Sequence, residues 1–126
     1  MTLAAAAAAV VAAGLTGAAA TTPKVVISAP GHTAKVNVHW NYTVSVTEGG
    51  KPVAAKLTEQ IVDPIGGVHV VQEGPSTKNI LNLPIKGVYR DYIIWPSDSR
   101  GIPLTLRITV RVGKAKKVLN YAVTPH

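Results

Sequence analysis

The sequence predicts an all-β protein, an antiparallel β-sandwich of seven to eight strands preceded by a helical signal segment. Apolar and polar residues alternate over two long segments, 35–46 and 104–112, which is typical of strands with one buried face and one wet face. Glycine- and proline-containing turns interrupt the rest of the chain about every ten residues, a spacing typical of sandwich domains. Beyond residue 20 we find no ten-residue window that combines helical periodicity with the absence of glycine and proline.

The first twenty residues contain no charged side chain and are mostly alanine. The run ends in Ala18-Ala19-Ala20, small residues that are typical of the cleavage site of a secretory signal peptide. We therefore expect a signal peptide over 1–20 and one domain over 21–126, located in the periplasm, the cell envelope or the extracellular space. An uncleaved membrane anchor is the alternative, because the apolar run is close to the shortest that spans a bilayer.

The predicted strands share β-rich composition and are bounded by turns. In chain order they cover 24–28, 35–46, 53–62, 68–72, 79–83, 87–95, 104–112 and 117–123. In the second of them every other residue is expected to face the core, namely Val36, Val38, Trp40, Tyr42, Val44 and Val46. Trp40 lies in the middle of this segment, so we expect it at the centre of the core.

Three segments resemble small secreted bacterial Ig-like domains: His39–Val44 (HWNYTV), Gly50–Val53 (GKPV) and Ile61–Gly67 (IVDPIGG). The resemblance extends over residues 24–124 and implies an Ig-like or fibronectin type III-like sandwich. The turn Gly50–Val53 (GKPV) is also similar to one in copper-associated periplasmic sandwich domains. Those domains typically place a histidine at or near the mature N-terminus. In this chain the expected mature N-terminus is Thr21.

The most specific surface feature is the stretch 99–126, which holds six cationic residues and no acidic residue. Its candidate binding residues, here called the basic face, are Arg107, Arg111, Lys114, Lys116 and Lys117. Arg107 and Arg111 are four residues apart on one predicted strand, so both are expected on the same outward side. A surface of this kind is expected to bind an anionic envelope polymer, acidic phospholipid or an acidic protein, the alternative being a solvated face that only confers solubility.

Nucleic acid is not expected as a partner, because the chain is predicted to be exported and lacks regularly spaced stacking aromatics. Membrane contact is expected only through an uncleaved N-terminal segment. The absence of cysteine excludes disulfides, thiol nucleophiles and cysteine-ligated metal sites. We expect no cofactor.

Catalytic and metal sites have weak support in the sequence. No serine lies in a Gly-x-Ser-x-Gly motif, and the six acidic residues are expected mostly in turns or on strand surfaces. A copper or zinc site would require His32, His39 and His69 to converge, since their spacing shows no metal-binding motif. The leading hypothesis is an exported, non-catalytic Ig-like binding or structural module of the bacterial cell envelope, and a histidine-based metal-binding sandwich is the alternative.

Overall fold

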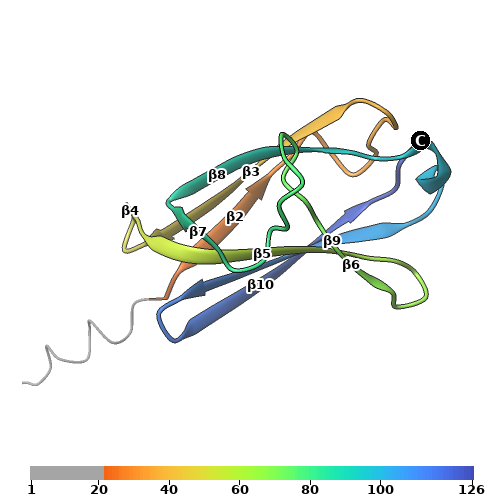
Figure 1. Cartoon of the computed structure of the whole chain (residues 1–126). Coiled ribbons are helices and arrows are strands. Elements are labelled where there is room, and N and C mark those ends of the chain that lie inside the picture. The colour runs from red at the N-terminus through yellow and green to blue at the C-terminus, as the bar shows by residue number, and fades with distance from the viewer. Residues whose placement is uncertain (1–21) are drawn as a thin grey trace, which may run out of the picture.

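The computed structural model describes residues 22–126, which form two antiparallel β-sheets facing each other (Figure 1). The predicted signal peptide, residues 1–20, lies outside the described residues. Within residues 22–126, no helix has the length and apolar character needed to cross a membrane. The all-β, antiparallel, sandwich-like character expected from the sequence is thus confirmed.

The first sheet is built around β3 (His39–Glu48). One edge of β3 pairs with β2 (Lys24–Ser28), and the other pairs with β8 (Val88–Ile94) and the two-residue strand β4 (Lys51–Pro52). Trp40, Tyr42, Val44 and Val46 of β3 are all buried, as the alternation predicts.

The second sheet has β9 (Leu104–Val112) between β10 (Ala115–Val123) and β5 (Ala54–Val62). The outer edge of β5 is shared by two short strands, β7 (Leu83–Lys86) and β6 (Val68–Val70). A short 3-10 helix, η1 (Ser97–Ser99), lies in the loop between β8 and β9.

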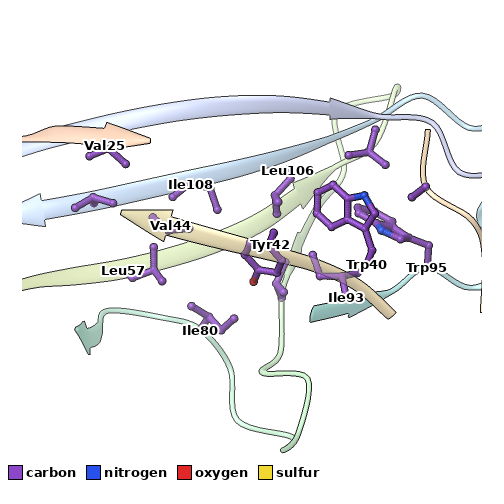
Figure 2. Close-up of a cluster of buried hydrophobic side chains, with 14 of the residues drawn as sticks. Val25, Trp40, Tyr42, Val44, Leu57, Ile80, Ile93, Trp95, Leu106 and Ile108 are labelled. Carbon is purple, nitrogen blue, oxygen red and sulfur yellow. The ribbon is translucent and has the colours of Figure 1, made fainter. Parts of the chain in front are cut away.

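One hydrophobic core fills the space between the sheets. Figure 2 shows Trp40 beside Trp95, with Leu106 and Ile108 of the second sheet near Val44 and Tyr42 of the first. The two indole rings meet edge to face with centroids 5.6 Å apart, an arrangement favoured by the aromatic quadrupole. Trp40 is only 3% exposed, so its predicted place in the core is confirmed.

Residues 71–80, here called the 71–80 hairpin, join the two sheets on one side. The amide of Glu59 donates to the carbonyl of Ile80 and the carbonyl of Glu59 accepts from the amide of Val71, both at 3.0 Å. At the far end of the hairpin, the Gly74 amide donates to the Asp91 carboxylate of β8 at 3.0 Å. The hairpin therefore connects the middle of β5 in one sheet to β8 in the other.

The predicted strand 35–46 is wrong at its start, because β3 begins only at His39. Asn37 has a φ of 64°, a left-handed conformation that asparagine tolerates and that interrupts a strand. Val38 is consequently 42% exposed instead of buried. Residues 32–36 instead run parallel to the end of the chain, with Thr124 donating to His32, His126 donating to Ala34, and Val36 donating to His126.

The predicted strand 79–83 is also wrong except for its last residue. Asn82 has a φ of 51°, so the extended conformation starts only at Leu83. Ile80 lies in the 71–80 hairpin and is fully buried. The other predicted strands correspond to observed strands with small shifts at their ends, and 24–28 and 104–112 match β2 and β9 residue for residue.

Candidate anion-binding face

Three cations lie side by side on the outward face of the second sheet. Along β9, Leu106, Ile108 and Val110 are fully buried, so the residues between them point away from the core. Arg111 pairs with Lys56 of β5 on one side and with Lys116 of β10 on the other. Because paired residues of neighbouring strands share a face, Lys56, Arg111 and Lys116 form one line across three strands, here called the cationic row.

Two further rows continue this face along β9. Thr109 lies between Thr58 and Val118, and Arg107 lies between Gln60 and Asn120. Arg107 and Arg111 are four residues apart on the same side of the strand, which places their Cα atoms about 13 Å apart. The outward face therefore carries positive charge at both ends of a stretch of hydroxyl, amide and aliphatic side chains.

A shallow hollow of about 330 Å³ lies over Thr109 on this face, here called the Thr109 hollow. Arg107, Arg111 and Lys116 border it, and Leu81 and Asn82 approach it from the segment before β7. The backbone N–H of Asn82 donates a 3.0 Å hydrogen bond to Oγ1 of Thr58, which fixes this segment against β5. The left-handed conformation of Asn82 is thus part of the wall of the hollow.

The positive charge of this face has no carboxylate partner. No acidic residue lines the Thr109 hollow, and the only ion pair among residues 22–126 joins Asp63 to His69 elsewhere in the molecule. The Nε atom of Arg107 is buried without a hydrogen-bond partner in the described part of the chain. Unpaired cations on a neutral surface attract anions from solution.

The structure brings together only part of the predicted basic face. Arg107, Arg111 and Lys116 meet at the Thr109 hollow, whereas Lys114 is an exposed residue of the turn between β9 and β10. Lys117 pairs with the buried Val110, so it projects to the opposite side of the sheet from the cationic row.

Lys56 belongs to the cationic row but is absent from the predicted basic face. It is distant in sequence from the arginines and joins them through the pairing of β5 with β9. The sequence holds a signal for it that the predicted basic face did not use: Lys56 lies between the apolar residues Ala55 and Leu57 of the predicted strand 53–62, and alternation along a strand places it on the outward side.

A second polar feature lies inside the core. Glu59 is fully buried, and it is the exception among the six acidic residues, the other five of which are intermediate or exposed. The Tyr42 hydroxyl donates to Oε1 of Glu59, while Oε2 has no hydrogen-bond partner in the described structure. Burial raises the pKa of Glu59 to about 8, the Tyr42 hydrogen bond acts in the opposite direction, and the nearby Asp91 charge adds to the rise. A carboxyl group kept neutral in this way links β3 to β5 without contact with solvent.

The histidines lie apart and have different partners. His32 stacks on Tyr121, with ring centroids 4.3 Å apart, and His39 stacks on Tyr92 at 3.8 Å. His69 places Nε2 3.0 Å from Oδ2 of Asp63. Residues 22–126 contain no group of three or more histidine, cysteine or acidic side chains arranged to hold a metal ion. The structure thus does not bring His32, His39 and His69 together.

Comparison of this chain with protein-family models, with curated proteins and with solved structures gives no match. The chemistry of the outward face of the second sheet is therefore the basis for a functional assignment.

Proposed function

We propose that this protein is an exported, non-catalytic Ig-like module that binds an anionic polymer of the bacterial cell envelope through the outward face of its second sheet. The observation that carries the proposal is the cationic row of Lys56, Arg111 and Lys116, with Arg107 further along β9 and no carboxylate beside them. A single exposed charge contributes little to binding, but several aligned charges act together on a chain of anions.

The shape of the face favours an extended ligand. Neighbouring strands lie about 4.8 Å apart, so the cationic row extends over about 10 Å across the sheet. The Thr109 hollow is open and shallow, and a polymer can pass over it while several of its units contact cations. Its lining has no carboxylate, histidine or serine to act as base or nucleophile, which supports binding rather than catalysis at this face.

The order of the strands supports an Ig-like scaffold. In immunoglobulin constant-type domains the first, second and fifth strands share one sheet, and the third, sixth and seventh share the other. Here β2, β3 and β8 lie in one sheet and β5, β9 and β10 in the other, in the same chain order, with the short strand β4 added to the first sheet and the short strands β6 and β7 to the second. Such a fold supplies a rigid surface but does not identify a ligand, so the proposed activity depends on the side chains of the outward face.

Export is proposed from the apolar segment 1–20. N-terminal sequencing of protein recovered outside the cytoplasm is expected to start at Thr21. A sequence starting at Met1 or Thr2 would contradict cleavage.

Binding to a polyanion is tested with two double variants of equal charge. Arg111→Gln with Lys116→Gln removes two charges from the cationic row, and Lys24→Gln with Arg90→Gln removes two exposed charges from the first sheet. We expect the parent protein to bind long polyglutamate with an affinity that falls as salt is raised, because salt screens exposed charges.

The first double variant is expected to lose at least about tenfold in affinity, and the second to lose much less. All four side chains are exposed, so thermal stability is expected to change by no more than about 0.5 kcal/mol per substitution. Equal binding by the two variants would show that only net charge matters and would refute a defined binding face.

A further inference from the structure

We infer that the Thr109 hollow binds one or two units of an acidic polysaccharide, so that the ligand of this face is an acidic glycan rather than a polyanion of any backbone. This inference rests on the proposed function, because it names the chemistry of the polymer that the same face binds. Three kinds of side chain meet in the hollow, and an acidic sugar uses all three.

The cations supply the recognition of the acidic group. Arg107 and Arg111 approach the hollow from its two ends, and Lys116 borders it from β10. A guanidinium group offers paired N–H donors that match the oxygens of a carboxylate or sulfate group. None of these cations has an ion-pair partner in the described structure, so a bound anion replaces no existing contact.

The surface of the hollow between Arg107 and Arg111 is lined by uncharged polar side chains. The hydroxyls of Thr58 and Thr109 and the amides of Gln60 and Asn82 lie there. Each of these groups can both donate and accept hydrogen bonds, as the hydroxyls of a sugar also do. Because Oγ1 of Thr58 already accepts from the backbone N–H of Asn82 at 3.0 Å, the hydroxyl hydrogen of Thr58 is left to donate to a ligand. Polyphosphate offers acceptors only and would leave the side-chain carbonyls of Gln60 and Asn82 without donors.

Two aliphatic side chains complete the lining. Leu81 is 57% exposed and Val118 is 41% exposed, and both border the hollow. They can cover the C–H face of a sugar ring, whereas a simple inorganic polyanion has no apolar surface to place there. A volume of about 330 Å³ lies at the small end of the range of ligand sites, about 300–1,000 Å³, which suits one or two sugar rings.

The test compares ligands that carry the same acidic group on and off a sugar. Oligogalacturonate is paired with polyglutamate of equal charge, and dextran sulfate is paired with poly(vinyl sulfate) of equal charge. Affinity of the full chain for each is measured by titration calorimetry at fixed salt. In at least one pair we expect the sugar-based ligand to bind about tenfold more tightly, the effect of one or two additional net hydrogen bonds.

If both pairs bind equally, the glycan inference is wrong while the proposed binding of polyanions stands. If no ligand binds, both the inference and the proposed function are wrong. Fully methyl-esterified oligogalacturonate, which keeps the sugar and loses the charge, is expected to bind at least about tenfold more weakly than its acid form.

Two matched glutamine variants test the position of the site. Gln60→Ala removes an amide from the hollow, and Gln72→Ala removes an exposed amide from the 71–80 hairpin. Gln60→Ala is expected to weaken binding of the sugar-based ligand more than binding of its sugar-free partner, and so to remove most of the preference. Gln72→Ala is expected to leave both unchanged. An unchanged preference in Gln60→Ala would overturn the assignment of this hollow.

Discussion

Glu59 makes the stability of the fold depend on pH in a direction opposite to that of an ordinary salt-bridged acid. Its side chain is fully buried and its pKa is raised from 4.5 to about 8, chiefly by desolvation. Between these two values the folded protein binds a proton that the unfolded chain has lost. The contribution of Glu59 to the free energy of unfolding is therefore highest below pH 4.5, and it falls as the pH rises toward 8.

The magnitude follows from proton linkage. One proton changes the free energy of unfolding by at most about 1.4 kcal/mol per pH unit. Over the interval from 4.5 to about 8, the loss amounts to several kcal/mol, and it levels off at higher pH because Glu59 is then ionised in both states. A loss of this size is a large fraction of the stability of a typical domain, about 5–15 kcal/mol.

The assay is urea denaturation of the parent and of Glu59→Gln at several pH values between 5 and 9. The amide keeps the shape of the side chain and cannot ionise, so the difference between the two proteins isolates Glu59 from all other titrating groups. We expect the parent to lose stability relative to Glu59→Gln as pH rises. Parallel pH profiles would refute the conclusion that Glu59 is held neutral in the core.

Tyr42→Phe provides a second comparison for the same group. The Tyr42 hydroxyl donates to Oε1 of Glu59 and thereby lowers the pKa of Glu59 against the larger effect of burial. Removing the hydroxyl is expected to raise the pKa of Glu59 in the folded state, so the loss of stability that begins near pH 4.5 continues to a higher pH than in the parent. A shift to lower pH would show that the hydrogen bond favours the neutral form instead.

Two further predictions concern packing and the hairpin between β5 and β6. Trp40→Ala is expected to lower the free energy of unfolding by about 3–5 kcal/mol, because a large aromatic side chain is removed from a packed core. Thr43→Ala, on the outward side of β3, is expected to lower it far less. Similar denaturant midpoints for the two variants would contradict the observed orientation of β3. Asp63 is expected to titrate below its ordinary pKa of 3.8, mainly because of the hydrogen bond with His69 and then that from the Gly67 amide. In an NMR titration His69→Ala should raise the pKa of Asp63, and an unchanged value would show that the backbone amides alone lower it.

The strand pattern could be predicted where alternation in the sequence matches a regular strand. Leu104–Val112 alternates without interruption and forms β9 as expected. A similar alternation in 35–46 includes Val36 and Val38, but β3 begins only at His39. The strand is interrupted because Asn37 takes a left-handed conformation and the Val36 amide donates a hydrogen bond to the carbonyl of His126. That bond joins residues ninety positions apart, and local pattern contains no sign of it.

The candidate site was predictable only in part for a similar reason. Arg107 and Arg111 share a face because they lie on one strand, and this follows from spacing alone. Lys56 and Lys116 join them through sheet register, which has to be known before residues of different strands can be aligned. Glu59 follows the alternation of β5 after Ala55 and Leu57, so the pattern indicated an inward side chain that its charge argued against.

The parallel contact between residues 32–36 and the end of the chain determines how the domain would respond to mechanical load. Figure 1 places the start of β2 and the C-terminus at opposite ends of the sandwich. A force that pulls these ends apart slides 32–36 along 124–126, so the three hydrogen bonds at His32, Ala34 and Val36 are loaded together in shear rather than broken one at a time.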